Sequence, residues 1–293
     1  MKILVAGANG QVARSLNELE AKSRHEIRCL GRPEFDISDK DSVSRVFAEN
    51  EFDLLINAAA YTAVDAAESD EEAAFATNEI GVGILARATE RLKRPIFHIS
   101  TDYVFDGTAD DPYLEDMPVC PLGVYGKSKL DGEVSLRQEN PKHLILRTAW
   151  VYSPFGKNFV KTMLRLAEDR DEVSVVADQI GSPTYAVDIA RTLLALADEL
   201  DRTGADDFKW GTYHLACSDH GSWADVAEEV FAASKMLGGP TASVRRITSA
   251  EYPTPVTRPA NSRLDTNKLQ QTFDIRLPNW RDSVKACVER LIT

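Results

Sequence analysis

The sequence lacks an excess of basic residues and any long apolar run, and each absence excludes a class of protein. Its 293 residues include 34 Lys and Arg against 46 Asp and Glu, which gives a formal net charge of −12. Binding to nucleic acid or to anionic membrane surfaces requires a cationic face, so we expect neither as a partner. No segment approaches the roughly 18 consecutive apolar residues of a transmembrane helix. We therefore expect a soluble cytoplasmic protein.

Cysteine and histidine are also scarce and widely spaced. The four cysteines form no C-x-x-C pair, which argues against a zinc knuckle or a disulfide framework and suits a reducing compartment. The five histidines show no H-x-x-x-H spacing, and the sequence contains no G-x-S-x-G motif. Metalloenzyme and hydrolase functions are therefore disfavoured, and we assign no metal-binding residues.

The first half of the chain alternates short apolar runs with longer amphipathic segments. This βαβα rhythm predicts a Rossmann-like, doubly wound parallel sheet with helices on both faces. Each apolar run has the length of a strand and is rich in Ile, Leu or Val, as strands buried on both faces should be. We predict strands at 2–6, 26–30, 53–57, 95–100 and 143–149, and helices near 11–22, 41–50, 71–93 and 126–137.

The rhythm loosens after Trp150, which predicts a second, smaller part interleaved with the first. The division we expect places the cofactor-binding Rossmann part at 1–152, together with about 173–200. The smaller C-terminal substrate-binding part then comprises mainly 153–172 and 201–293. Within the second half we expect helices near 157–168, 186–200 and 222–237, strand-like runs at 173–177 and 212–217, and a proline-punctuated loop at 252–259.

A glycine-rich turn directly follows the first predicted strand. Gly7 and Gly10 open a helix in the spacing that lets a backbone turn sharply and approach a pyrophosphate, whose charge then lies at the helix N-terminus. Ala13 stands at the third glycine of the extended G-x-x-G-x-x-G pattern, where close packing of helix and strand tolerates one methyl group. The turn therefore predicts a dinucleotide site, and an ordinary βα turn is the alternative.

The residue that follows the second predicted strand bears on the choice of dinucleotide. An acidic residue there binds a ribose 2′-hydroxyl in NAD enzymes, but this sequence has Arg32. A guanidinium favours the 2′-phosphate of NADPH, although a solvated surface arginine is an equal alternative and NADH remains possible. Asp36 and Ile37 follow at a position suited to flank the adenine.

Tyr125 and Lys129 lie four residues apart and therefore share one face of a predicted helix. A nearby ammonium favours the phenolate, so we expect Lys129 to lower the pKa of Tyr125 and to make it a proton donor and acceptor for a ketone and its alcohol. Lys129 can also hold the nicotinamide ribose. The hydroxyl-bearing segment at 100–102, after the fourth strand, can bind the same carbonyl oxygen.

Several longer motifs occur in a fixed order along nearly the whole chain. They lie at 7–11, 57–65, 100–107, 125–129, 147–152, 178–184 and 258–265. Taken together, these motifs resemble the dTDP-4-dehydrorhamnose reductase family of the extended short-chain dehydrogenase/reductases. The resemblance implies reduction of the 4-keto group of dTDP-4-dehydro-L-rhamnose by NAD(P)H, the last step to dTDP-L-rhamnose.

The resemblance also implies roles for individual residues. The catalytic positions are matched by Thr101, Tyr125 and Lys129. Cofactor-binding positions are matched by Gly7, Asn9, Gly10, Gln11, Val12, Arg32, Asp36, Ile37, Ala58, Ala59, Ala60 and Tyr61, together with Tyr125 and Lys129. Positions around the sugar nucleotide are matched by Val64, Tyr103, Trp150 and Arg258, for which core packing or surface salt bridges are the alternatives.

Other functions remain open at the level of sequence. Within the same class, the enzyme could give another stereoisomer of a nucleotide 4-keto-6-deoxysugar, or it could be a sugar-nucleotide epimerase. A non-catalytic NADP-binding regulatory subunit is the alternative from another class, and the joint presence of Thr101, Tyr125 and Lys129 argues against it. The family resemblance further implies a homodimer and an association with Mg²⁺, for which the sequence offers no coordinating set.

Overall fold

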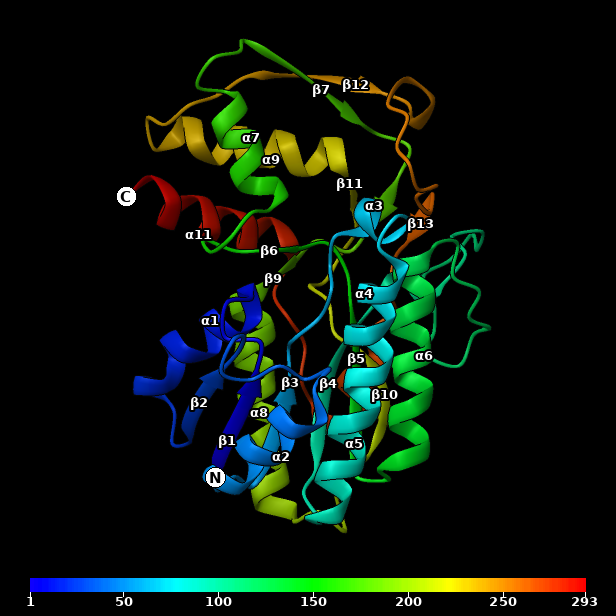
Figure 1. Ribbon diagram of the computed structural model, residues 1–293. Helices are drawn as coiled ribbons and strands as arrows, with labels where there is room; N and C mark the ends of the chain where they lie inside the picture. Colours follow the sequence, from blue (N-terminus) through cyan, green and yellow to red (C-terminus); the bar gives the residue numbers. More distant parts are fainter.

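A six-stranded parallel sheet forms the lower part of the molecule in the computed structural model, which describes residues 1–293 (Figure 1). The strand order is β10-β5-β4-β3-β1-β2, and every neighbouring pair is parallel. The carboxyl ends of the strands face the smaller upper lobe. The strands are β1 (Lys2–Ala6), β2 (Glu26–Leu30), β3 (Leu54–Asn57), β4 (Ile96–Thr101), β5 (His143–Thr148) and β10 (Gly211–His214).

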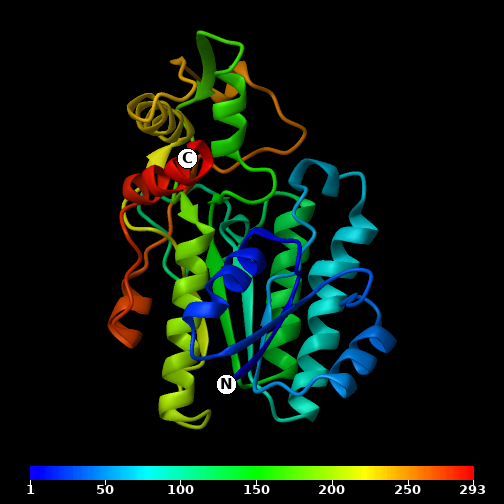
Figure 2. The ribbon, with the colours of Figure 1, turned by 90° about the vertical axis from the view of Figure 1, so that its left-hand side faces the viewer.

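Helices cover both faces of this sheet, as Figure 2 shows in a view along the layers. One face carries α1 (Gln11–Leu19) and α8 (Ala186–Thr203), and the other carries α2 (Lys40–Glu49), α5 (Gly81–Arg91) and α6 (Val124–Glu139). Alternate residues of β1 enter different cores: Ile3 and Val5 join the larger core under α1 and α8, while Leu4 and Ala6 join the core under α2 and α5. The predicted Rossmann-like fold is confirmed.

The helix predicted at 71–93 is interrupted near its middle. It consists of α4 (Glu71–Phe75), a π-helical turn at Ala76–Ile80 and α5. The turn brings Asn78 inward, where its side chain binds the backbone of Tyr61 and the hydroxyl of Ser128. A buried amide that satisfies both segments explains the interruption, because the helix must widen to present it.

The upper lobe packs three helices above the carboxyl ends of the sheet (Figure 1). These helices are α7 (Phe159–Leu166), α9 (Trp223–Met236) and α11 (Trp280–Ile292). Around them lie β6 (Val151–Tyr152), β7 (Glu172–Val176), β8 (Ile180–Gly181), β9 (Thr184–Tyr185), β11 (Gly221–Ser222), β12 (Ser243–Ile247) and β13 (Asn261–Ser262). The remaining helices are α3 (Val64–Ala67), α10 (Asn267–Phe273) and 3₁₀ turns at Glu20–Lys22, Asp102–Val104 and Ser249–Glu251.

Two elements join sheets other than those expected from the sequence. The run at 173–177, which we placed with the Rossmann part, forms β7 and pairs with β12 in a separate sheet of the upper lobe. The strand predicted at 212–217 falls in the stretch given to the substrate-binding part, yet it forms β10 and extends the large sheet beside β5. Apolar periodicity identifies a strand but carries no information about its partner, and long-range pairing decides that.

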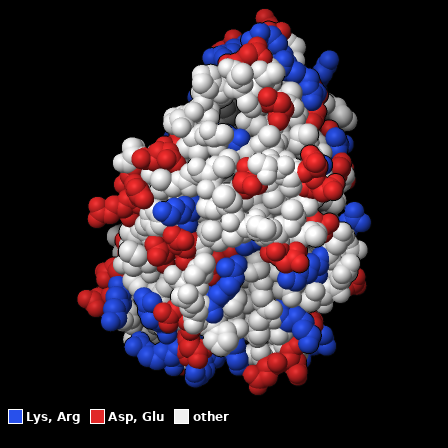
Figure 3. Space-filling view, turned by 90° about the vertical axis from the view of Figure 1, so that its right-hand side faces the viewer, with Lys and Arg blue, Asp and Glu red and all other residues white.

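Charge is distributed in small groups over one face of the molecule. On the face shown in Figure 3, Lys and Arg side chains are interspersed with Asp and Glu, and uncharged atoms cover much of the centre. This pattern agrees with the net charge of −12. None of the helices combines the length and the apolar character needed to cross a membrane.

Candidate active site

The turn between β1 and α1 closely approaches the loop after β3. Gly7 has φ +101°, and a Cβ atom there would lie 2.8 Å from the backbone of Ala58. Gly10 forms the N-cap of α1, whose first turn presents unpaired backbone N–H groups. Ala13 is fully buried in the core, so its methyl group packs where a third glycine would stand. The backbone therefore forms the narrow cradle that a pyrophosphate requires.

A cavity of about 190 Å³ lies over this turn and collects most of the predicted cofactor residues. Four further residues that the sequence analysis did not single out also line it: Ala8, Gly31, Phe35 and Thr77. The position of Gly31 directly before Arg32 was the available signal in the sequence. In the structure, a Cβ at Gly31 would lie 3.0 Å from the backbone N of Ala8. The predicted residues in its lining are Gly7, Asn9, Gly10, Arg32, Asp36, Ile37, Ala58, Ala59 and Ala60.

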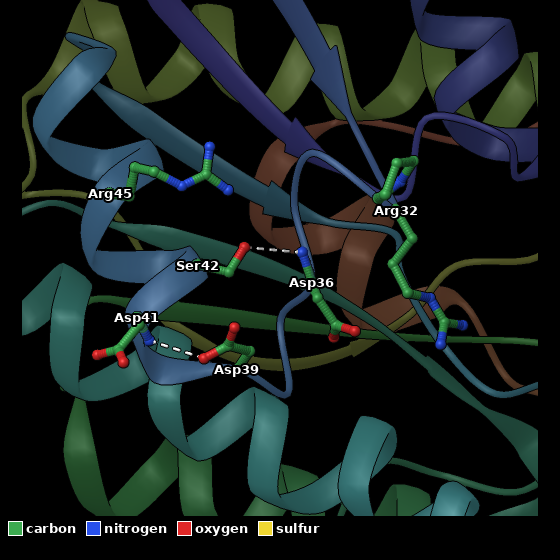
Figure 4. A pocket seen from close by; sticks show the side chains of 7 residues that line it. Arg32, Asp36, Asp39, Asp41, Ser42 and Arg45 are labelled. Atoms are coloured by element: carbon green, nitrogen blue, oxygen red, sulfur yellow. Dashed lines mark hydrogen bonds between the residues drawn. The ribbon is translucent and has the colours of Figure 1, made fainter.

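An open depression of about 660 Å³ adjoins the cavity and contains two guanidinium groups (Figure 4). Arg32 extends from the loop after β2, while Arg45 comes from α2 and donates to the carbonyl of Glu34. The carboxylate of Asp36 accepts from the backbone N and the hydroxyl of Ser38, at 3.0 and 2.6 Å. Because Arg32 forms no salt bridge within the chain, its charge is available to a ligand.

Three predicted cofactor residues use their side chains for other contacts. Gln11 donates to the carbonyl of Val151 and accepts from Ser153 and Asn158, so it links α1 to the upper lobe. Val12 packs in the main core, and Tyr61 donates its hydroxyl to Asp70 at 3.2 Å. For Gln11 and Val12, only the backbone N–H groups at the start of α1 are placed to approach a phosphate.

Tyr125 and Thr101 meet near the carboxyl end of β4, at the start of α6. The Thr101 hydroxyl lies close enough to the phenol to influence its pKa, and it donates to Asp102 Oδ1 at 2.9 Å. Burial raises the pKa of Tyr125, and the negative charge of Asp102 acts in the same direction. The expectation that Lys129 lowers this pKa is therefore wrong, because desolvation of the phenolate outweighs the distant ammonium. Tyr125 is a neutral phenol at physiological pH.

Asp102 is a further titratable group near Tyr125. It lies in the hydroxyl-bearing segment 100–102, but no role was assigned to it from the sequence. Its carboxyl is 2% exposed, and its Oδ2 has no hydrogen-bond partner. Burial raises the pKa of Asp102 to about 7, against the opposing effect of the Thr101 hydrogen bond. An unpaired oxygen of this kind beside a phenol is a polar group placed to meet a ligand.

Lys129 lies one helical turn after Tyr125 and is 2% exposed. Its Nζ donates to the carbonyl of Ile99 at 2.7 Å and lies 3.4 Å from His98 Nε2. Burial lowers the pKa of Lys129 to about 8, while Glu133, one turn further along α6, raises it. The amine therefore titrates near physiological pH.

A buried ion pair anchors this part of α6 to the sheet. Glu133 is fully buried and receives two hydrogen bonds from Arg147 of β5, at 2.9 and 2.7 Å. The Ser100 hydroxyl donates to the same carboxylate at 2.5 Å, and Arg137 contributes a further bond at 2.7 Å. These contacts lower the pKa of Glu133, with Arg147 the largest of the favourable influences. Ser100 is thus committed to structure, whereas the Thr101 hydroxyl donates to Asp102 and accepts from the backbone N of Tyr103 on the side of the phenol of Tyr125.

The boundary between the two lobes is marked by a strained aromatic residue. Trp150 adopts φ +48°, a conformation that bulky residues rarely take, and its ring stacks on Trp223 at 3.6 Å. Gly181 allows this arrangement, because a Cβ there would overlap the indole. Trp223 had no motif to identify it, since only the fold brings it to Trp150. Strain at an interlobe junction indicates a functional position.

Arg258, the other predicted sugar-nucleotide residue of the upper lobe, reaches across to the lower one. It donates to Asp65 Oδ2 at 3.0 Å, one residue after Val64 at the start of α3. Its Nε and the Oδ1 atom of Asp65 are both buried without a partner. Tyr103 packs edge-on against Tyr125, with ring centroids 5.5 Å apart. Tyr103 thus lies beside Tyr125, and the charges of Arg258 and Asp65 act on the Tyr103 phenol.

The structure contains no group of three or more His, Cys, Asp or Glu side chains arranged to hold a metal ion. The arrangement at the carboxyl edge of β3 and β4 instead combines a phosphate cradle, a neutral phenol, a hydroxyl and a buried amine. This set can bind a dinucleotide and transfer a proton to a carbonyl oxygen.

Comparisons with known proteins agree with the motifs. A family model described as the RmlD substrate binding domain matches residues 1–293. The dTDP-4-dehydrorhamnose reductase of Sinorhizobium fredii is 47% identical over 292 residues, covering 100% of this chain and 98% of the relative.

Solved structures give the same result. The crystal structure of a dTDP-4-dehydrorhamnose reductase from Clostridium acetobutylicum has a TM-score of 0.91 and 39% identity, and the match covers 100% of both chains. The Bacillus anthracis enzyme of that name, in complex with NADP, has a TM-score of 0.90 and 32% identity, with 99% of both chains covered. The chain therefore belongs to the dTDP-4-dehydrorhamnose reductase family.

Proposed function

We propose that this protein reduces the 4-keto group of dTDP-4-dehydro-L-rhamnose to give dTDP-L-rhamnose, with NADPH as the preferred reductant and NADH as an alternative. The observation that carries the proposal is the placement of Thr101 at the end of β4 and of Tyr125 and Lys129 one turn apart on α6, in a fold whose first turn, at Gly7, forms a phosphate cradle. Support for the substrate comes from the relatives, whose shared name specifies this sugar nucleotide.

The residues of the cradle suit a dinucleotide, because Gly7, with φ +101°, lets the turn pass closely against the backbone of Ala58 and Ala59 and present the start of α1 to a pyrophosphate. Gly7, Asn9 and Gly10, with the backbone at 11–12, would hold the diphosphate, while Arg32, Asp36 and Ile37 would contact the adenosine end. The segment at 58–61 would lie beside the remainder of the cofactor. When bound, a nicotinamide cofactor supplies the hydride that reduces the ketone.

The proton comes from Tyr125 in this account. Its raised pKa keeps the phenol protonated, which is the form that must donate to the 4-oxygen as the alcohol develops. Thr101 aligns that oxygen through its hydroxyl, and Lys129 holds the ribose hydroxyls with its amine. Val64, Tyr103, Trp150 and Arg258 would surround the sugar nucleotide, with the guanidinium on the diphosphate.

The direct assay follows oxidation of NADPH by the wild-type protein in the presence of dTDP-4-dehydro-L-rhamnose. The proposal predicts turnover that requires both compounds. An absence of turnover with this substrate, together with retained NADPH binding, would refute the assignment and favour a non-catalytic NADP-binding subunit.

Replacing Arg32 by aspartate should shift the cofactor preference from NADPH toward NADH. A charge-assisted contact with the 2′-phosphate contributes about 1.5–3 kcal/mol, so the ratio of kcat/KM for the two cofactors should fall roughly 10- to 100-fold. Arg45→Asp is the matched control in the same depression, with a smaller expected change because Arg45 is bound to the Glu34 carbonyl. An unchanged ratio in Arg32→Asp would exclude the 2′-phosphate role.

Arg258→Met should raise the KM for the sugar nucleotide by roughly 10- to 100-fold, because a charged hydrogen bond to the diphosphate is lost. The KM for NADPH should stay within about twofold. Asp65→Asn is the companion variant: it removes the carboxylate that pairs with Arg258 at 3.0 Å, so the KM for the sugar nucleotide should fall or remain unchanged. If Arg258→Met instead weakens NADPH binding, the residue belongs to the cofactor site.

We also propose that the protein acts in the cytoplasm as a homodimer, because the family resemblance implies these properties. The same resemblance implies Mg²⁺, but the structure offers no group of three or more His, Cys, Asp or Glu side chains to hold it. Light scattering at several protein concentrations measures the oligomeric state. Activity before and after treatment with a chelator measures the requirement for the cation.

A further inference from the structure

Three buried polar side chains lie in a row beneath the site, one from each of β3, β4 and α6. Asn57 and His98 are fully buried and occupy paired positions of neighbouring strands. Asn57 Nδ2 lies 3.0 Å from His98 Nδ1, and His98 Nε2 lies 3.4 Å from Lys129 Nζ. The role proposed for Lys129 does not account for the first two residues.

The orientation of Asn57 follows from its other neighbour. The backbone N–H of Ala59 donates to Asn57 Oδ1 at 3.1 Å, so the amide oxygen faces Ala59 and the NH₂ group faces the imidazole. An NH₂ group can only donate, and therefore His98 Nδ1 must accept. Amide orientation is assigned by such a network, and here a single backbone donor determines it.

The proton of His98 follows from the same contact. Full burial lowers the pKa of His98 well below its usual value, and Lys129 is the largest charged influence in that direction. A neutral imidazole has one N–H and one acceptor nitrogen. With Nδ1 accepting, the proton is on Nε2 and points toward the amine of Lys129.

A donor that faces an ammonium opposes its charge, whereas it can donate to the lone pair of a neutral amine. Other charged groups around these three residues also affect the protonation of Lys129 and His98, and some favour it while others oppose it. Glu133 of α6 favours the ammonium, while Arg137 of α6 and His143 of β5 act on His98 and disfavour its protonation. Arg147 of β5 is committed to Glu133, and Asp102 and Tyr125 lie toward the mouth of the site.

We propose that Asn57 fixes His98 in the tautomer protonated on Nε2, and that this N–H limits the charge on Lys129. Asn57 and His98 are thus positioning residues that act through the lysine. The proposal rests on the proposed function for its kinetic consequence only, because the tautomer is a property of the protein without substrate. An amine that is only partly charged near physiological pH can both donate and accept protons there.

The tautomer can be measured directly by NMR of ¹⁵N-histidine-labelled wild-type protein, using couplings between ring nitrogens and ring protons. His98→Gln identifies the resonances among the five histidines. We expect His98 to be neutral and protonated on Nε2 from pH 6 to 8. Protonation on Nδ1, or on both nitrogens, would overturn the proposal, and this result is independent of any activity.

Asn57→Asp supplies the kinetic test. Its carboxylate still accepts from Ala59, but it must also accept from His98, which moves the imidazole proton to Nδ1 and leaves Nε2 free to accept from the ammonium. The decline of kcat/KM on the alkaline side of the pH profile (the alkaline limb) should then shift to a pH about one unit higher. His98→Gln, which can present its amide oxygen to Lys129, should move the limb in the same direction.

His220→Gln is the matched control, because His220 is partly buried and its Nδ1 lies 3.2 Å from the Ser182 hydroxyl, away from His98 and Lys129. Its alkaline limb should stay at the wild-type position. An unchanged or lowered alkaline limb in Asn57→Asp would overturn the proposal, even if His98→Gln does not fold.

Discussion

Replacing Tyr125 by phenylalanine is expected to lower kcat by roughly 10²- to 10⁴-fold, which is the usual contribution of a positioned general acid. The change removes the phenol hydroxyl near Thr101 and keeps the ring that packs against Tyr103. Binding of NADPH should be retained, because the cradle at Gly7 is untouched. The measurements are single-turnover reduction of the sugar nucleotide and titration of cofactor fluorescence.

Tyr152→Phe is the matched control for this variant. Tyr152 is also buried, but its hydroxyl donates to the carbonyl of Trp280 in the upper lobe, away from Thr101 and Lys129. Its kcat should remain within about twofold of the wild-type value. If Tyr125→Phe keeps most of the activity while Tyr152→Phe does not, the proton donor has been assigned to the wrong phenol.

The largest effect on stability is expected for Glu133→Gln. The substitution keeps the volume of the side chain but leaves the buried Arg147 guanidinium without its counter-charge. Breaking a buried ion pair on one side costs about 3–5 kcal/mol, which is a large fraction of the stability of a typical domain. Urea denaturation of the two proteins measures the difference.

The difference in unfolding free energy between wild type and Glu133→Gln is expected to change with pH in a definite direction. The pKa of Glu133 is lowered in the folded state, so its stabilisation is present above the unfolded pKa and is lost as pH falls through the folded pKa. The gap between wild type and Glu133→Gln should therefore narrow on acidification. Arg147→Met in both backgrounds completes the cycle, and additive effects of the two changes would contradict a coupled pair.

Glu133→Gln also separates two influences on Lys129. Because the Glu133 carboxylate raises the pKa of Lys129, its neutralisation should move the alkaline limb of activity downward. This direction is opposite to that expected for Asn57→Asp. A common direction for both variants would indicate a general disturbance of α6.

The sheet and its helices were predictable because the central strands are buried on both faces and so appear as continuous apolar runs, although the edge strand β2 has exposed Glu26 and Arg28. Leu54 to Ile56, for example, are fully buried in β3. The upper lobe was less accessible to this reasoning. In β12, three of the five residues are exposed, and its partner β7 lies about 70 residues earlier in the chain. Helices α10 and α11 were not predicted at all.

In the candidate site, too, features that are local in sequence were predictable, and contacts between distant segments were not. The Gly7 turn and the pair of Tyr125 and Lys129 are local in sequence, so spacing alone indicated their shared surfaces. The partner of Arg258 could not be predicted, because Asp65 lies 193 residues away and only the closure of the upper lobe brings them together. His98 is a similar case, since its neighbours Asn57 and Lys129 come from different elements.

The raised pKa of Tyr125 shows a further limit of sequence reasoning. A helical spacing of four residues correctly predicted that Lys129 follows one turn later, but it did not reveal the degree of burial. Desolvation depends on the whole surrounding fold, and here it determines which form of the phenol is present. The outcome suits ketone reduction, in which the protonated phenol is the reactive form.

The most direct test of the proposed function is the fate of a deuterium label. The protein would be incubated with dTDP-4-dehydro-L-rhamnose and NADPH deuterated at the transferred position, and the product examined by NMR. The proposal predicts dTDP-L-rhamnose with deuterium on C4 of the sugar. A product without the label, another stereoisomer at C4, or unchanged substrate would contradict it.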